Sequence, residues 1–497
     1  MRYITLAGSI LMGALGCGGV AAFAQNNAPT TPAPYNPLAL NEVTGSPRTA
    51  VQSGQADDRS LSQTPYLGGI PSGKLSTTPM SLSLEDAVNL ALKRNLGGVL
   101  ASDVVTGARG QFWQALSELL PNVTTATSFG VHQNDLRAVF GLSIPGVPPI
   151  IGPFGYFDAR AYFTEPVFNW ESIERTRSSE EQLQSAELSA RDAREIIVLV
   201  IVANYLLATA DESEVEAATS QRDTAKALFQ QASDQQTSGL ASAVDVLRAQ
   251  VQLEAREQKV ISARNSLAKQ KLALARAIGL PLGQPFELTT RTPYHELIPS
   301  SLDDAIDGAY KARSDFRSQM DRVHAAELAK QAAAAERYPS IGSEVGYGLS
   351  GVNPGTSHGT IDAAITLRVP VFQGGRVHGD VLQADAELTR EKQLLEDLRA
   401  RIDQEVRDAY LDLASSAEEV SVEKSAVELA TQNLEQSRDR FSSGVTDNVE
   451  VVQAQDALAI ANDAYIASLY SYNLAKISLG RATGVAESRY AQYLGGN

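Results

Sequence analysis

The sequence is nearly devoid of cysteine, because its 497 residues contain only Cys17. Cys17 lies in an apolar N-terminal segment that ends in Ala22-Phe23-Ala24, a pattern typical of a secretory signal peptide over residues 1–24. The mature chain would then begin at Gln25 without a disulfide, so its stability must come from packing or assembly. Ala14-Leu15-Gly16-Cys17 also faintly resembles a lipoprotein processing site, so lipidation of Cys17 is an open alternative.

The chain also lacks an excess of positive charge, clustered histidines and long apolar runs. Its formal net charge is −16, which leaves little electrostatic attraction for nucleic acid. The five histidines are scattered without metal-ligand spacing, and no nucleophile motif occurs, so we expect no enzyme, no cofactor and no metal site. The most apolar segment of the mature chain, 196–210, is shorter than the ~20 residues of a membrane-spanning helix. Any membrane-spanning part must therefore consist of β-strands.

Glycine and proline are missing from two very long stretches. No proline occurs from 167 to 280, where Gly239 and Gly279 are the only glycines, and no glycine occurs from 380 to 443. Stretches this long, rich in Ala, Leu, Glu, Gln and Arg, predict helices, and one over 171–238 would be about 100 Å long. We expect it to turn at Gly239 into a second helix over 240–279.

The chain is internally duplicated after a flexible arm. Residues 25–80 are rich in Pro, Ser and Thr and are predicted to be flexible. From residue 81, motifs recur: Ser83-Leu84-Glu85-Asp86-Ala87-Val88 returns as Ser301-Leu302-Asp303-Asp304-Ala305-Ile306. We expect a first repeat over 81–290 and a second over 291–497, each with a leading helix (85–120 in the first) and a long helical hairpin. Apolar residues recur every seven positions from Val246 to Leu274 and from Val451 to Leu479, which is typical of coiled-coil-like packing.

Each repeat also contains a pair of sequences with the two-residue period of strands. We predict strands over 122–131, 157–168, 341–350 and 360–372, with one apolar face and one polar or glycine face. A transmembrane barrel requires this alternation, although a soluble half-buried hairpin has it too. Four strands cannot close a barrel, so several copies would have to combine, and three would supply twelve strands. The segment 132–156 is expected to be a loop outside the cell.

The chain resembles the TolC-like outer-membrane efflux proteins over nearly all of 81–490. The duplication, Pro370-Val371-Phe372-Gln373-Gly374-Gly375 and Arg440-Phe441-Ser442-Ser443-Gly444 carry this resemblance. It implies a mainly α fold with a small β part, assembled as a homotrimer with a twelve-stranded barrel in outer-membrane lipid and a periplasmic α-helical barrel. It also implies a periplasmic adaptor protein and an inner-membrane pump as partners. A rival hypothesis is a periplasmic adaptor or coiled-coil interaction protein.

The resemblance places the functional residues at the two helix turns. It implies a pore constriction formed by Glu450, Gln453, Asp447 and Asp245, and tip turns with adaptor contacts at Gly239, Gly444, Arg440 and Phe441. It also implies strand-to-helix switches at Pro166, Pro370, Gly374 and Gly375. Gln453 occupies the position of the family's second tip carboxylate, and Thr446 occupies the position of its basic latch residue. We therefore expect a differently latched closed state. Ser242-x-x-Asp245 and Asp447-x-x-Glu450 also have capping-box spacing, so these carboxylates could instead cap helices.

Overall fold

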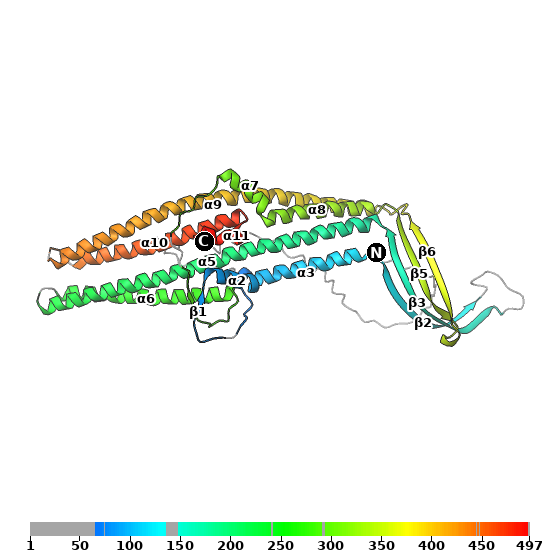
Figure 1. Cartoon of the computed structure of the whole chain (residues 1–497), viewed down its shortest axis with the longest axis horizontal. Coiled ribbons are helices and arrows are strands. Elements are labelled where there is room, and N and C mark those ends of the chain that lie inside the picture. The colour runs from blue at the N-terminus through cyan, green and yellow to red at the C-terminus, as the bar shows by residue number, and fades with distance from the viewer. Residues whose placement is uncertain are drawn as a thin grey trace, which may run out of the picture. The chain divides into compact units, whose positions relative to one another are not determined.

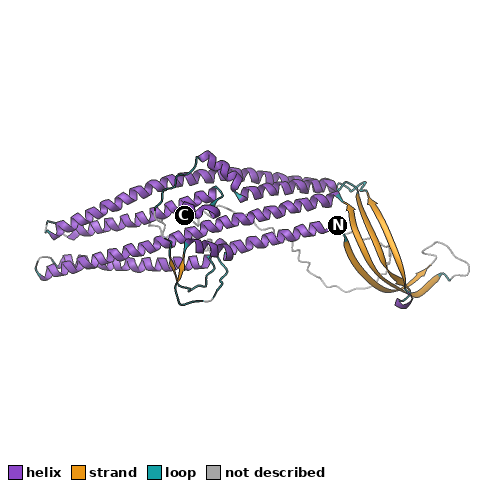
Figure 2. Cartoon of the chain, viewed as in Figure 1, coloured by secondary structure: helices purple, strands orange, loops and turns teal. Residues whose placement is uncertain are grey.

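The computed structural model describes residues 65–73, 75–135, 148–239, 242–290, 294–443, 445–446 and 448–495. The expected signal peptide, Cys17, most of the N-terminal arm, Gly444 and Asp447 lie outside the described residues. The described chain is mainly helical with a small β part, as the sequence predicts (Figure 2).

Two long helical hairpins, one in each repeat, account for most of the fold (Figure 1). The first consists of α5 (Trp170–Thr237) and α6 (Ala243–Ala277), and the second of α9 (Arg376–Ser442) and α10 (Asn448–Ala482). With a rise of about 1.5 Å per residue, α5 and α9 are each about 100 Å long. The seven-residue pattern faces the packed surfaces, since Val260, Leu274, Val451 and Leu479 are buried. Helix α10 also packs along α5 and so joins the two hairpins.

The leading helix of each repeat is broken in two, so the single helix predicted over 85–120 is wrong. In the first repeat α2 (Leu84–Arg94) and α3 (Leu96–Ser117) flank Asn95; in the second α7 (Leu302–Ala312) and α8 (Ser314–Ala335) flank Arg313. The residues at the two breaks, Asn95 and Arg313, have an extended backbone, with ψ of 133° and 123°.

A buried side chain stabilises each of these breaks. Nδ2 of Asn95 donates to the backbone oxygens of Tyr66 and Ala277, at 2.6 and 3.1 Å, while Nη1 of Arg313 donates to that of Ala482 at 3.2 Å. These contacts satisfy carbonyl groups at the ends of neighbouring helices. The breaks arise from tertiary hydrogen bonds instead of glycine or proline, so helix propensity alone could not reveal them.

Four strands form one antiparallel sheet in the order β2–β3–β5–β6. They are β2 (Asn122–Asp135), β3 (Ile150–Phe168), β5 (Ser340–Gly351) and β6 (His358–Arg368), with a short 3-10 helix, η4 (Pro354–Thr356), between the last two. The first strand pair extends beyond its predicted ends at 131 and 157, so described residues at both ends of the loop expected over 132–156 are strand. Strand β6 ends before the predicted 372, because Pro370 cannot donate a ladder hydrogen bond.

The strand-to-helix switches differ between the repeats. Pro166 lies at a register shift within β3, between Pro166 and Phe168, and α5 begins shortly afterwards. Gly374 and Gly375 follow the second strand pair with φ of 62° and 87°, a left-handed conformation that favours glycine. Gly375 is the N-cap, the residue immediately before α9 begins.

The two faces of the sheet differ in chemistry, as the alternation predicts. Tyr347, Ile361 and Ile365 project from one face and are 66%, 68% and 80% exposed. Gly346, Gly348 and Asp362 occupy the alternate positions of the same strands. A soluble monomer rarely exposes a contiguous apolar surface of this kind, so this face is built to contact an apolar environment.

The last part of the N-terminal arm is ordered, so the flexibility predicted for all of 25–80 is wrong for 65–73 and 75–80. The 3-10 helix η3 (Pro65–Leu67) is followed by backbone hydrogen bonds from Ile70 to Arg94 and from Ser72 to Gly279, and β1 (Met80–Leu82) pairs in parallel with β4 (Phe286–Leu288). A Cβ at Gly69 would lie 2.6 Å from the Arg276 oxygen, so glycine is required for this close approach.

The apolar segment 196–210 is part of the core. Helix α5 contains a window long and apolar enough to span a membrane, but 67% of that window is buried within the fold. Ile197, Ile201 and Tyr205 are fully buried, against residues of α2, α6 and the C-terminal helix α11 (Ala486–Tyr493). Core packing therefore accounts for the hydropathy of this segment.

Candidate functional site: the hairpin tips and the contacts between hairpins

The first hairpin turns at Gly239, and its carboxylate caps a helix. Gly239 has φ of 72°, and Ser242 is the residue before α6 begins. The Asp245 carboxylate accepts hydrogen bonds from the backbone N–H of Ser242 at 3.2 Å and from its hydroxyl at 2.6 Å, while Oγ of Ser242 accepts from the Asp245 N–H. Arg248 lies 3.5 Å from the same carboxylate. The capping interpretation of Asp245 is therefore confirmed.

The second tip holds its carboxylate differently. Glu450 lies 3.5 Å from Nη1 of Arg440 at the end of α9, and it also accepts a hydrogen bond from the Thr446 hydroxyl. The N–H of Val445 donates to the Arg440 oxygen at 2.9 Å, which closes the turn. Thr446 thus contacts Glu450 although it is not basic, and Arg440 supplies the cation from the preceding helix.

Electrostatically, the Glu450 charge is largely balanced within its own chain. The side chains of Arg440 and Glu450 are 56% and 35% exposed, so their ion pair is solvated and contributes about 0–1 kcal/mol. Gln453, three residues further along α10, is exposed and uncharged at physiological pH. The described part of this tip therefore has little net charge.

Phe441 packs between the hairpins. It is half-buried against a small apolar cluster composed of Leu228 of α5, Leu434 of α9, and Val451 and Ala454 of α10. Close to it, a cavity of about 910 Å³ separates α5 from the end of α9 and is lined by residues that include Asp223, Arg438 and Ser442. The hairpins therefore meet through a thin apolar contact beside an open groove.

Ion pairs between α6 and α10, which the sequence did not predict, link the hairpins away from the tips. Arg256 pairs with Asp456, and Lys259 lies 2.6 Å from Glu214 of α5 and 3.2 Å from Asp463 of α10. Although burial lowers it, the hydrogen bond that Lys259 donates to Glu214 and the charges of Glu214 and Asp463 raise the pKa of Lys259 above its usual value. Each of these residues looks like an ordinary exposed helix charge in the sequence, and only the packing brings them together.

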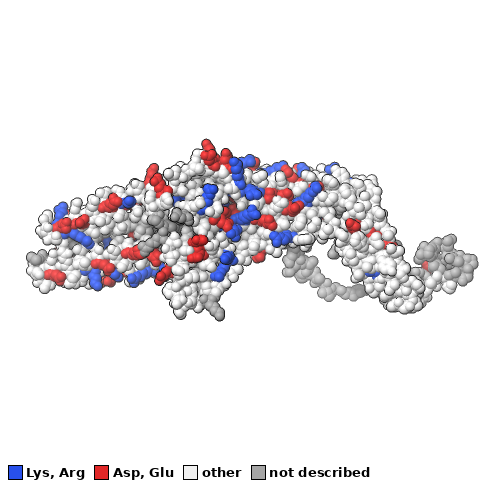
Figure 3. All heavy atoms as spheres, in the orientation of Figure 1, with Lys and Arg blue, Asp and Glu red and all other residues white. Residues whose placement is uncertain are grey.

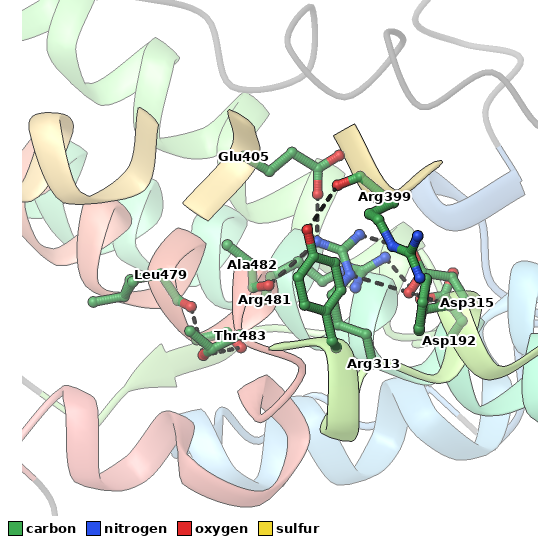
Figure 4. Close-up of polar contacts among 12 residues, drawn as sticks. Asp192, Arg313, Asp315, Arg399, Glu405, Leu479, Arg481, Ala482 and Thr483 are labelled. Carbon is green, nitrogen blue, oxygen red and sulfur yellow. Dashed lines mark hydrogen bonds and ion pairs between the residues drawn. The ribbon is translucent and has the colours of Figure 1, made fainter. Parts of the chain in front are cut away.

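A buried charge network anchors the second hairpin at the other end of α10 (Figure 4). Arg313 makes a two-pronged contact with Asp315, at 2.7 and 3.0 Å, and Nη1 donates to Glu405 at 2.5 Å. Arg481 donates to Asp192 at 2.7 Å. The network joins α5, α8, α9 and α10, whereas the corresponding part of the first repeat is the apolar core around Ile197.

Two acids of this network have pKa values shifted in opposite directions. Although burial raises it, the hydrogen bonds and charge of Arg313 lower the pKa of Asp315 to about 2. Burial raises the pKa of Asp192, an effect that the charge of Arg481 offsets only in part. Arg313 is therefore the cation on which this network depends.

The family model described as "Outer membrane efflux protein" matches residues 101–280 and 305–485. The chain belongs to this family. It is 25% identical over 340 residues to the alkaline protease secretion protein AprF of Pseudomonas aeruginosa, an alignment that covers 67% of this chain and 70% of AprF. The match in two halves agrees with the internal duplication.

Solved structures of similar fold come from outer-membrane channels. VceC of Vibrio cholerae superposes with a TM-score of 0.69 at 20% identity, over 81% of this chain and 96% of VceC. CmeC of Campylobacter jejuni superposes with a TM-score of 0.72 at 16% identity, over 90% of this chain and 98% of CmeC. This family member is located in the outer membrane, with its helical part in the periplasm. The periplasmic-adaptor hypothesis is therefore wrong.

The distribution of charge agrees with this location. Figure 3 shows acidic and basic side chains over the long helices, whereas the visible face of the sheet is almost free of charge. Water solvates the charges on the helices, while hydrocarbon excludes charge from an outward-facing strand surface. The roles assigned to individual tip residues remain predictions.

Proposed function

We propose that the chain forms a homotrimeric outer-membrane duct for a tripartite efflux or type I secretion system. The observation that carries this proposal is a four-stranded sheet with an exposed apolar face and two edge strands, β2 and β6. An open edge is not tolerated in lipid. Three copies would supply twelve strands (3 × 4), with β6 of each copy closing on β2 of the next. Each repeat, 81–290 and 291–497, would contribute one strand pair and one helical hairpin.

Export through this duct is passive and is gated where the hairpins converge in the periplasm. The closed state is stabilised by the Phe441 contact and by the ion pairs of Arg256 and Lys259, all of which join the two hairpins. Three copies of Glu450 and Arg440, with Gln453, Asp447 and Asp245, would surround the narrowest part. Because each Glu450 pairs with an Arg440, this constriction would attract cations only weakly.

The proposed partners follow from the family and the location. A periplasmic adaptor would contact the tip turns at Gly239, Gly444, Arg440 and Phe441 and would connect the duct to an inner-membrane pump. Arg440 is the more exposed of the two tip side chains, since Phe441 is half-buried. Energy would come from the pump, because the family members are channels.

Single-channel conductance of the purified trimer in a planar lipid bilayer tests the function. We expect discrete steps with weak cation selectivity, which Arg440→Gln increases and Glu450→Gln decreases, because the two changes leave opposite charges unbalanced. Glu487→Gln is the matched control, since Glu487 also pairs with a partly exposed arginine, Arg194, but lies in α11, away from the tips.

Absence of steps from correctly assembled trimers, both alone and with the cross-hairpin ion pairs removed, would overturn the duct function. If channels conduct but neither Arg440→Gln nor Glu450→Gln changes their selectivity, the duct function stands, and this ion pair is not part of the constriction.

A further inference from the structure

A cluster of acidic and basic side chains occupies the polar face of the sheet, at the opposite end of the long helices from the tips (Figure 1). Asp158 and Arg160 lie two residues apart on β3 and therefore project from the same face. Nε of Arg160 donates to Asp158 at 2.9 Å, and Nη1 of Arg160 pairs with Asp362 of β6. The Tyr156 hydroxyl also donates to Asp158, at 3.0 Å. The side chains of Asp158 and Arg160 are only 13% and 14% exposed, whereas that of Asp362 is 68% exposed.

Glycines of the intervening strand make this cluster possible. Arg160 pairs with Gly348 of β5, and Asp362 pairs with Gly346 of the same strand. A Cβ at Gly348 would lie 2.5 Å from Cα and 2.6 Å from Cγ of Arg160, and one at Gly346 would lie 3.3 Å from the Tyr162 ring. Arg160 can therefore cross β5 to reach β6 only because β5 has no side chains there.

The cluster leaves one net negative charge in each chain. Two carboxylates and one guanidinium sum to −1, and the most exposed member is the acid Asp362. Glu344 and Arg368 lie on the same face nearer the helices, where their charges are opposite in sign. In a closed barrel the apolar face would contact lipid and this face would line the lumen.

We propose that Asp158, Arg160 and Asp362 form a charged band in the barrel lumen that determines the charge selectivity of its membrane-spanning part, independently of the periplasmic tips. This inference rests on the proposed trimeric duct. The band carries a charge of −3 per trimer, so it favours cationic and zwitterionic solutes over anionic ones. Low-dielectric lipid around the lumen strengthens its field. Arg160 moderates the band, which without it would carry −6.

Cysteine labelling of adjacent residues on opposite faces provides the test. The only natural cysteine lies in the expected signal peptide, so Asp362→Cys and Ile361→Cys each introduce one reactive thiol. Both positions are well exposed in the single chain, so a large difference in labelling would report which face of the sheet meets lipid after assembly. We expect water-soluble charged thiosulfonates to modify the cysteine at 362 and not the one at 361.

The change in selectivity should follow the charge at position 362. Measured in an Arg440→Gln/Glu450→Gln background, which removes both charges of the tip ion pair, Asp362→Cys should lower the cation-to-anion permeability ratio by about twofold or more, as expected for unit charges ~10 Å from the pore axis in water. A sulfonate reagent should restore the ratio, and a trimethylammonium reagent should lower it further. Arg160→Gln should raise it.

Each outcome bears on the inference. Labelling at 361 but not at 362 would reverse the faces of the sheet and overturn the band. Labelling at 362 without any change in the permeability ratio would show that the band does not control selectivity. Either result, obtained from trimers that conduct, would leave the duct function in place, whereas trimers that never conduct would refute the duct itself.

Discussion

The ion pair between Arg256 and Asp456 offers a direct test of how the hairpins are held together. Arg256→Glu replaces an attraction between α6 and α10 with a repulsion, and Asp456→Arg on that background restores a pair of opposite orientation. The Arg256 side chain is 17% exposed and that of Asp456 is 48% exposed, so the pair is solvated on one side. We therefore assign it about 0.2–1 kcal/mol per chain.

Three such pairs in a concerted trimer would sum to about 0.6–3 kcal/mol. Since 1.4 kcal/mol corresponds to a factor of ten, losing them should raise the ratio of open to closed channels by roughly 3- to 150-fold. The assay is the open probability of single channels at low salt, where such pairs are least screened. We expect Arg256→Glu to increase the open probability and the double variant to reverse most of that increase. An open probability unaffected by either change would refute the idea that this contact opposes opening.

Two further predictions concern the buried network. Arg313→Met removes the cation shared by Asp315 and Glu405, and it should destabilise the fold by about 3–5 kcal/mol. Asn95→Ala at the equivalent break removes a neutral group and should cost about 1–3 kcal/mol, so equal losses in denaturation midpoint would contradict the reasoning. The second prediction concerns pH. The folded pKa of Asp315 is about 2, below its usual 3.8, so the ionised carboxylate stabilises the fold above about pH 4. This contribution, about 2 kcal/mol, is lost as the pH falls toward 2. The raised pKa of Asp192 acts in the opposite sense, so the measurement is the difference in acid stability between the natural protein and Asp315→Asn, which should shrink over that range.

The periodic features of the fold could be predicted from the sequence because they depend on local rules. The absence of glycine and proline between 380 and 443 predicts α9 within a few residues, and the alternation around Tyr347 predicts the apolar face of the sheet. The breaks at Asn95 and Arg313 could not be predicted, because each requires a carbonyl group from a helix more than 160 residues away in the chain. The order of residues 65–73 around Gly69 could not be predicted for the same reason, since it comes from backbone hydrogen bonds with Arg94 and Gly279.

The tip residues show where residue-by-residue comparison with a family reaches its limit. The family resemblance identifies Thr446 as the position that lacks the family's basic residue, and it therefore predicts a differently latched closed state. In the folded chain Arg440 approaches Glu450 from the preceding helix, and Thr446 binds the same carboxylate. A charge that is absent at one position of a turn can thus be supplied from the other side of that turn, because the two helix ends lie within one side-chain length of each other. If the Arg440 charge stabilises the closed state, exchanging Arg440 and Thr446 by Arg440→Thr and Thr446→Arg should preserve that state. Arg440→Thr alone should weaken it, which the same open-probability assay would measure. Equal behaviour of the single and double variants would show that the Arg440 charge is not part of the latch.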